Sequence, residues 1–407
     1  MNTAAWYRTA TPRQWKVLAA AVFGWMLDGM DVMLYSFALT RIQHEFGFSS
    51  AVAGGVASVT LLSSAFGGVA FGYVADRFGR TKALGISILA YSAFTAATAT
   101  SHSLAELIVW RLLVGLGLGG EWAAGAALVA EEWPAEHRGK AIGIVQSGWA
   151  LGYIAAALLA AAIIPTHGWR LLFVVGVAPA LLSAWVWRSV PEPEVWRTAV
   201  QKSQPSIKII FTSPLLRTTV VAIAVCSSLM FAYWGLFTWV PAYLASPRAS
   251  GGAGMSIVQS ASWIVPLQIG AFFGYTSFGF LADRFGRRPT FVIFVLSAAA
   301  CVPVYGLFGK SPEVLLLTGP LLGFFGHGYF SVFGAMLAEL FPSGVRATAQ
   351  GLCYNAGRGI SALAPFTIGF IADRSGIGMA LASTSVFYVI GAVMIYLLPE
   401  TKGRELK

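Results

Sequence analysis

Twelve long apolar runs, separated by short polar segments, dominate this 407-residue sequence. A helix needs about 20 apolar residues to cross a membrane, and only α-helices and closed β-barrels satisfy their backbone hydrogen bonds inside lipid. The runs are continuous and do not alternate as barrel strands do. We therefore predict an all-α membrane protein with twelve transmembrane helices. They are expected at residues 17–39, 52–74, 83–101, 104–128, 140–163, 169–188, 217–240, 257–280, 289–308, 312–338, 348–371 and 377–398.

The composition supports a membrane protein and argues against other classes. The chain is 57% hydrophobic and 11% charged, whereas a soluble domain carries about 25% charged residues. The net charge of +10 would suit a nucleic-acid partner, but Lys and Arg stand at the ends of the apolar runs. Cys226, Cys301 and Cys353 lie inside apolar runs and show no disulfide or metal-binding spacing. We expect no nucleic-acid partner, no metal and no cofactor.

The basic residues predict how the chain lies in the membrane. With both termini on one side, 20 of the 27 Lys and Arg residues fall on that side and five on the other, while Arg111 and Arg358 lie inside spans. Positive charge beside spans favours the cytoplasmic face, and the N-terminal segment lacks the cleavage pattern of a signal peptide. We expect an inner or plasma membrane protein with both termini in the cytoplasm.

The sequence repeats itself at an offset of 207 to 208 residues. A polar stretch at 189–216 separates the copies and reads as a cytoplasmic linker. The repeats predict two six-helix bundles, residues 1–188 and 217–407, the second ending in a cytoplasmic tail. Duplicated bundles are common in transporters, with the substrate site near the midplane between them. The copies are GYVADRFGR at 72–80 with GFLADRFGR at 279–287, and EEWPAEHRGKAIG at 131–143 with ELFPSGVRATAQG at 339–351.

GYVADRFGRTK resembles the loop signature of the major facilitator superfamily, G-x-x-x-D-R-x-G-R-x-K, and its second copy follows the eighth span as the family's does. DGMD in the first span, RLLVGLGLGGEW in the fourth and the following EEWP…HRGKAIG are similar to the metabolite and sialate proton-symporter branch. The resemblance implies that the two halves rock about a central site and that proton binding is coupled to substrate movement. Sialic acid importers of this branch usually carry two extra spans where this chain has a short linker, which argues against sialic acid.

Asp28 and Asp31 stand three residues apart in the first span and share a helix face. A charge at the bilayer centre costs about 3 kcal/mol on insertion scales, so each acid needs a partner or a function. At about 1.5 Å per residue, Arg111 in the fourth span reaches a depth close to that of Asp28. Either an arginine–acid pair acts as a switch that protonation opens, or it is a permanent ion pair that braces the two spans.

Glu121 follows a glycine stripe in the fourth span. The stripe predicts close packing of a neighbouring helix. Because burial favours the neutral form of a carboxyl group, Glu121 is either a second proton-coupling residue or a hydrogen-bonding residue between helices. The stripe consists of Gly115 and Gly119, with Gly117 and Gly120 beside them.

Arg358 lies near the middle of the eleventh span, with Asn355 on the same face and no acid in its own apolar run. A guanidinium can hold a carboxylate through two hydrogen bonds, so we predict that Arg358 binds an anionic substrate. The alternatives are pairing with helix-end carbonyls, or with Asp28 or Asp31 of the other half. His327 either titrates near neutral pH or packs through a hydrogen bond. Further residues expected to line the cavity, unless they only face lipid or the core, are Arg111, Gln146, Trp149, Tyr153, Tyr233, Trp234, Gln268 and Tyr275.

The duplicated loop places charged residues at the cytoplasmic ends of spans. They lie too far from the midplane to touch the substrate, and we predict that they form a latch that favours one closed state. The residues are Asp76, Arg77, Gly79 and Arg80 in the first copy, and Asp283, Arg284, Gly286 and Arg287 in the second.

The sequence thus predicts a transporter and not an enzyme, since it has no nucleotide-binding loop, metal cluster or nucleophile–base pair. We expect a proton-coupled symporter that imports a small organic anion, a monocarboxylate, by alternating access, as a monomer in the lipid bilayer. The alternative on the same fold is a proton-coupled efflux carrier for drugs or metabolites.

Overall fold

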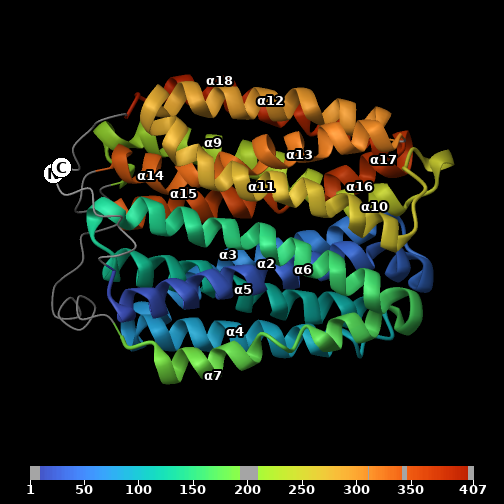
Figure 1. The fold of residues 1–407 in the computed structure, drawn as a ribbon, viewed down its shortest axis with the longest axis horizontal. Helices are drawn as coiled ribbons and strands as arrows, with labels where there is room; N and C mark the ends of the chain where they lie inside the picture. Colours follow the sequence, from blue (N-terminus) through green and yellow to red (C-terminus); the bar gives the residue numbers. More distant parts are fainter. Residues whose placement is uncertain (1–9, 193–209, 310, 342–345, 402–407) are drawn as a thin grey trace.

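The computed structural model describes residues 10–192, 210–309, 311–341 and 346–401 (Figure 1). Within these ranges the chain is helical and contains no β-strand. It forms the predicted twelve membrane-crossing segments in two bundles of six. Eight stretches of the described chain are long and apolar enough by themselves to cross a membrane. Most of the predicted linker, residues 193–209, lies outside the described residues.

The first bundle consists of long helices that extend beyond the predicted apolar runs. The first begins with a capping box, in which Thr11 accepts from the Gln14 N–H and Gln14 accepts from the Thr11 N–H, so it starts before the first apolar residue. The range given for α6 contains two helices that meet at Gly168, whose φ of 75° and ψ of 178° are not helical, so the fifth span ends and the sixth begins at this residue. The helices are α2 (Pro12–Phe46), α3 (Ser50–Phe78), α4 (Arg80–Thr98), α5 (Leu104–Glu132), α6 (Ala135–Val175) and α7 (Ala180–Ser189).

The second bundle is more interrupted, so that four of its spans are divided into shorter helices. Two of the breaks precede Pro241 and Pro365, because proline lacks the N–H that a continuing helix needs. Another break falls at Thr384, whose hydroxyl bonds the Leu381 carbonyl. The elements are α9 (Ser213–Phe237), α10 (Val240–Ala245), η2 (Arg248–Ser250), α11 (Ile257–Phe285), α12 (Arg287–Phe308), α13 (Pro312–Gly328), α14 (Phe330–Leu340), α15 (Arg346–Ser361), α16 (Ala364–Ser375), α17 (Ile377–Ser383), α18 (Ser385–Met394) and η3 (Ile395–Leu397).

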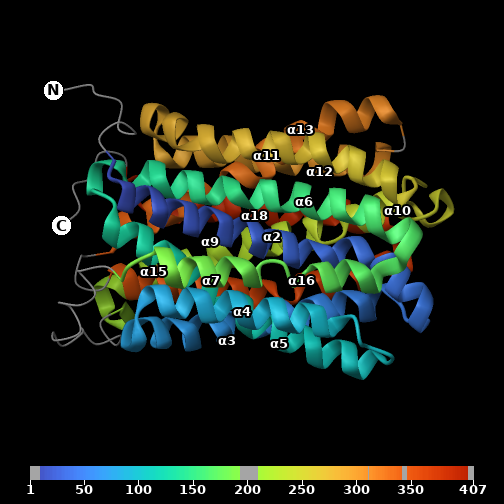
Figure 2. The same ribbon diagram turned by 60° about the horizontal axis from the view of Figure 1, so that its bottom comes forward.

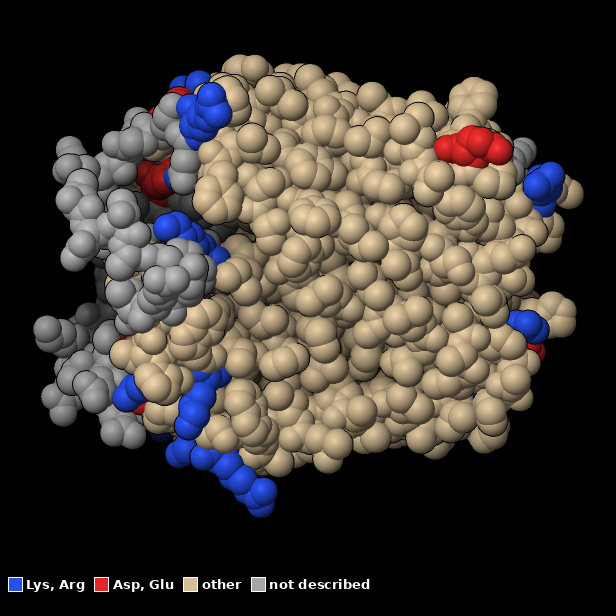
Figure 3. Space-filling model, in the orientation of Figure 1, with Lys and Arg blue, Asp and Glu red and all other residues tan. Residues whose placement is uncertain are grey.

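The two bundles lie side by side with their helices roughly parallel (Figures 1 and 2). They meet mainly where α3 packs on α15 and α16, and where α6 packs on α11. Helix α2 begins at the end of the molecule shown at the left in Figure 1, which we call the terminal end, and the opposite end is the far end. On the face shown in Figure 3, a wide uncharged band separates the two ends, and most Lys and Arg side chains lie at the terminal end.

Candidate functional site

Asp31 in α2 has Arg111 of α5 as its main charged neighbour. Arg111 is buried, its Nε donates to Thr60 Oγ1 at 3.3 Å, and its guanidinium lies 5.1 Å from the centre of the Tyr35 ring. Both Asp31 carboxylate oxygens are buried and have no hydrogen-bond partner among the described residues. Of the two acids in the first span, Asp31 is therefore the one that faces Arg111, at a distance too long for a closed ion pair.

Asp28, one turn nearer the terminal end, instead faces Arg358 of α15, its main charged neighbour. Glu121 of α5 interacts electrostatically with both residues, and its carboxyl group packs against Gly24, where a methyl group would collide with it. All three charged side chains are buried. Asp28 and Glu121 belong to the first bundle and Arg358 to the second, so this three-residue charge cluster bridges the two halves.

A chain of aromatic rings lies beside this charge cluster, since Trp25 stands one turn from Asp28, Trp122 follows Glu121 and Tyr354 stands one turn from Arg358. The Trp25 ring lies 4.7 Å from Trp122 and 4.9 Å from Trp149, measured between ring centres. Two further contacts cross between the bundles, from Trp149 to Trp234 of α9 at 5.8 Å and from Trp122 to Tyr354 of α15 at 5.9 Å. Rings from α2, α5, α6, α9 and α15 therefore form an aromatic wall beside the charges, suited to the flat body of a small molecule.

Many buried polar atoms near the centre have no hydrogen-bond partner in the part of the chain that the structure describes. Leaving such groups unpaired is costly in a folded protein, so their number points to a site that takes up water, protons or a ligand. The side chains concerned are Trp25, Asp28, Asp31, Arg111, Glu121, Gln146, Trp149, Tyr233, Gln268, His327 and Arg358.

Some polar side chains of the second bundle, and of its boundary with the first bundle, have a hydrogen-bonding atom that is free for a ligand, and others are already hydrogen-bonded. His327 Nδ1 lies 3.1 Å from the Gly323 carbonyl oxygen, an acceptor, so Nδ1 carries the proton and Nε2 remains as a free acceptor. Its ring packs against Tyr233 and Tyr275 at 5.1 and 5.7 Å. Tyr153 is already engaged, since its hydroxyl donates to the Phe237 carbonyl of the other half at 2.9 Å.

The glycine stripe has the packing role that the sequence predicts, and Asn355 contacts the opposite bundle. The glycine stripe packs α5 on α3, because a methyl group at Gly115 or Gly119 would collide with the backbone of α3. The Asn355 amide oxygen points at Gly68 of α3, where an added Cβ would lie 2.9 Å from it. Asn355 thus lies against the opposite bundle, while Arg358, one turn away, belongs to the charge cluster; a substrate contact by Asn355 stays a prediction.

The duplicated loops at the terminal end have matching backbone geometry. Gly79 (φ 119°, ψ 149°) and Gly286 (φ 109°, ψ 155°) each end one helix and begin the next. After each glycine, an arginine pairs with the end of another helix. The two ion pairs are Arg80 with Glu131 at 3.1 Å and Arg287 with Glu339 at 3.3 Å. The side chains of Asp76 and Asp283 lie outside what the structure describes, so their role in a latch stays a prediction, while Arg77 and Arg284 stack on neighbouring rings.

Two glutamates that sequence reasoning missed cap the helices that follow these loops. Glu192 accepts from the Thr81 and Lys82 N–H groups at 3.1 and 3.2 Å, and Glu400 accepts from the Arg287 and Arg288 N–H groups at 3.1 and 3.0 Å. Both follow a proline, at positions 191 and 399, so a Pro-Glu pair recurring at the repeat offset of 208 was the available signal.

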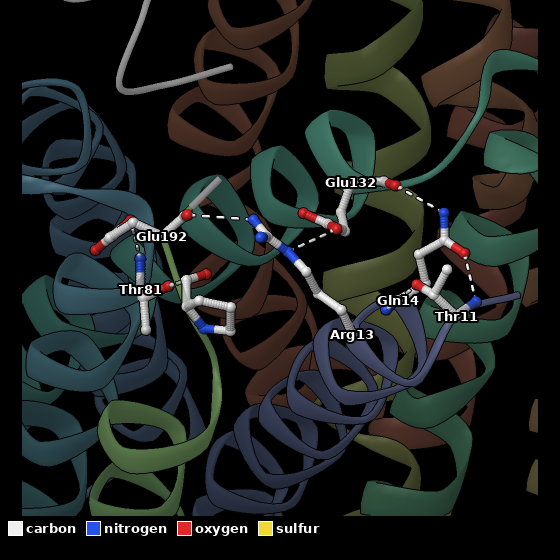
Figure 4. Close-up of polar contacts among 7 residues, drawn as sticks. Thr11, Arg13, Gln14, Thr81, Glu132 and Glu192 are labelled. Carbon is white, nitrogen blue, oxygen red and sulfur yellow. Dashed lines mark hydrogen bonds and ion pairs between the residues drawn. The ribbon is translucent and has the colours of Figure 1, made fainter. Parts of the chain in front are cut away.

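Arg13 ties this arrangement to the start of α2 (Figure 4). Its Nε lies 2.8 Å from a Glu132 carboxylate oxygen, and its Nη2 donates to the Glu192 carbonyl at 3.3 Å. Gln14 Nε2 also donates to the Glu132 carbonyl. The terminal ends of α2, α4 and α5 and the segment after α7 are thereby held together as one unit of the first bundle.

The comparisons with known proteins agree with the fold. The family model described as Major Facilitator Superfamily matches residues 21–275, and a sugar (and other) transporter model matches residues 246–407. A putative metabolite transport protein of Haemophilus influenzae is 35% identical over 404 residues, covering 96% of this chain and 98% of that protein. The cis,cis-muconate transport protein of Acinetobacter baylyi is 35% identical over 390 residues, covering 93% of each. The crystal structure of a D-xylose-proton symporter has the same fold, with a TM-score of 0.78 at 21% identity, covering 97% of this chain and 100% of that one.

The chain belongs to the Major Facilitator Superfamily. It is an integral, multi-pass membrane transporter and not an enzyme, as the sequence predicted.

Proposed function

We propose that this transporter is a proton-coupled symporter that imports a small organic anion, a monocarboxylate, by alternating access. The observation that carries the proposal is the buried cluster of Asp28, Glu121 and Arg358, which spans the two halves and has unpaired polar atoms. It offers one cation that can bind a carboxylate and two acids that can bind protons.

The cluster supports a direct link between anion and proton. While Arg358 faces Asp28 and Glu121, its positive charge stabilises their ionised forms. A substrate carboxylate that binds Arg358 adds a negative charge beside the two acids and draws the arginine toward itself. Protonation of Asp28 or Glu121 then becomes more favourable, and by linkage a bound proton makes Arg358 more available to the anion. Asp31 and Arg111 form the adjacent charge pair, which lies wholly within the first half.

The aromatic wall supports a flat, unsaturated acid as the cargo. Trp25, Trp122, Trp149, Trp234 and Tyr354 come from both halves, so the ring contacts between Trp149 and Trp234 and between Trp122 and Tyr354 must change when the halves rock. The similar protein of Acinetobacter baylyi is named as a transporter of muconate, an unsaturated dicarboxylic acid, so it supports an unsaturated cargo and not the single carboxyl group. The excess of basic residues at the terminal end supports a cytoplasmic position for both termini.

The proposal is tested by uptake of labelled organic acids into proteoliposomes. We expect at least one small carboxylic acid to accumulate above its equilibrium level when the outside is more acidic, and a protonophore to abolish the accumulation. The amide of the same acid should neither enter nor compete. Uptake of all acids at equal rates with and without the pH gradient, or equal transport of acid and amide, would contradict proton coupling or anion recognition respectively.

A further inference from the structure

The loop motif has a third copy, at the opposite end of the molecule. GFIADRSG at residues 369–376 joins α16 to α17 at the far end, 297 residues after GYVADRFG at 72–79. Its glycine, Gly376, has φ 83° and ψ 153°, close to the values of Gly79 and Gly286. The Arg374 guanidinium lies 3.8 Å from the centre of the Phe370 ring, four residues earlier. The same helix–glycine–helix corner is therefore built on the far side of the membrane.

The third copy keeps the aspartate of the motif but lacks the arginine that follows the glycine. Arg80 and Arg287, which pair with α5 and α14 in the first two copies, are replaced by Ile377, which is buried. The aspartate is retained as Asp373. A motif that keeps its acid but loses the arginine that forms the ion pair points to a role for the acid that does not depend on that ion pair.

Asp373 binds the start of a helix in the other bundle. Its Oδ1 accepts from the Ser50 N–H at 3.0 Å, and its Oδ2 accepts from the Ala51 N–H at 2.9 Å. These are the first two residues of α3, where the N–H groups have no partner within the helix and the helix dipole favours a negative charge. One carboxylate of the second half thus caps a helix of the first half with both oxygens.

The two helices below this cap approach so closely that their backbones touch. A methyl group at Gly54 would collide with the Pro365 carbonyl, and one at Gly369 would collide with the Ser50 carbonyl. One turn further in, the Phe366 N–H donates to Ser58 Oγ at 3.2 Å. The halves are therefore closed against each other along α3 and α16 at the far end.

The pseudo-symmetric position lacks this contact. The helix of the second half that corresponds to α3 is α11, and it is capped internally by Ser256 and Gln259 in a complete capping box. The residue 208 positions before Asp373 is Pro165, which has no carboxylate to offer. At α3, the Ser49 side chain accepts a hydrogen bond from the Val52 N–H. The N–H groups of Ser50 and Ala51 take their acceptor from the other half, at Asp373. Of the two pseudo-symmetric helix starts, that of α3 is therefore capped by a carboxylate of the other half, and that of α11 is capped by its own residues.

We propose that Asp373 is a gating residue, which holds the far end of the transporter closed by capping α3 across the interface between the halves. Opening to the far side requires both hydrogen bonds to break, and α3 then loses its cap. The proposal rests on the transporter class and on this contact, and it does not depend on which substrate is carried.

The test measures the distance between the halves at the far end. Spin labels are placed on cysteines introduced at His102 and Ala249, which are exposed at the far end of the first and second bundles, with Cys226, Cys301 and Cys353 replaced by alanine. In lipid nanodiscs, Asp373→Asn should raise the ratio of long to short distances about tenfold, because a charged acceptor of two hydrogen bonds is lost. The matched control is Glu313→Gln, which removes an exposed acid from the same end and the same half and should leave the distances unchanged.

A reciprocal variant removes a donor instead of the acceptor. Ser50 is the first residue of α3 and follows an extended residue, so Ser50→Pro is tolerated by the helix while it removes the N–H. Ser50→Ala keeps the N–H and serves as its control. We expect Ser50→Pro to open the far end less than Asp373→Asn does, and the double variant to match Asp373→Asn alone. Unchanged distances in folded Asp373→Asn, an equal shift in Glu313→Gln, or additive effects in the double variant would overturn the proposal.

Discussion

At the residue scale, Arg358 has two sets of possible partners, the acids of the first half and an incoming carboxylate. A charge-assisted hydrogen bond contributes roughly 1.5–3 kcal/mol, so Arg358→Ala should weaken binding of the transported acid at least tenfold in an equilibrium binding assay with the purified protein. Arg358→Lys should restore binding only in part, because an ammonium group cannot make the two-pronged contact.

Arg111 is the matched control for that experiment. It is equally buried, but it faces Asp31 and Thr60 within the first half, so Arg111→Ala should reduce coupled transport more than equilibrium affinity. Retained affinity in Arg358→Ala together with lost affinity in Arg111→Ala would assign the anion site to the first half.

Which of the three buried acids carries the coupled proton can be decided by measuring pH-driven accumulation and substrate exchange separately. We expect at least one of Asp28→Asn, Asp31→Asn and Glu121→Gln to abolish pH-driven accumulation while substrate exchange across the membrane remains measurable. Because Asp28 and Glu121 share Arg358, and Asp31 also interacts electrostatically with Asp28, substitutions of Asp28 should be non-additive with those of both other acids. Proteoliposome assays of uptake and of exchange decide this, and accumulation in all three variants would exclude coupling through these acids.

At the element scale, the closed far end depends on two helices that touch through glycine. Gly54→Ala places a methyl group against the Pro365 carbonyl, and overpacking of this kind typically costs about 1–3 kcal/mol. The variant should unfold at a lower temperature or populate the open far end. Gly72 lies in the same helix with nothing within 4 Å of an added methyl group, so Gly72→Ala should be neutral or slightly stabilising. Equal thermal stability and equal far-end distances in the two variants would contradict this view of α3.

The elements also show which parts of the structure the sequence could predict. Hydrophobic runs, the repeat and the isolated charges predicted the twelve spans, the two bundles and the buried positions of Asp28, Asp31, Glu121 and Arg358. Depth along a helix does not say which neighbour a side chain faces, so the division of partners between Asp28 and Asp31 needed the structure. Trp25 and Trp122 were missed because a tryptophan in an apolar run looks the same whether it faces lipid or a site.

At the scale of the whole molecule, the described interior of the bundles carries an unequal number of acids and bases. Asp28, Asp31 and Glu121 face Arg111 and Arg358, which leaves a net charge of −1 when all are ionised. An anion that enters this interior adds another negative charge, and uncompensated charge inside a bilayer is costly. Binding of the anion should therefore take up protons from solution, with a stoichiometry set by the interior as a whole.

This charge balance leads to a prediction that needs no membrane gradient. In weakly buffered detergent solution with a pH indicator, adding the transported acid as its neutral salt should make the solution more alkaline, by about one proton per anion bound. The control is the amide of the acid, which carries no charge and should cause no change. Because Arg358 is the cation nearest two of the acids, Arg358→Ala should abolish the proton uptake along with binding, whereas a double Asp28→Asn, Glu121→Gln variant should bind the anion with no uptake of protons. Anion binding by the unmodified protein without any proton uptake would show that substrate and protons do not share this interior at equilibrium.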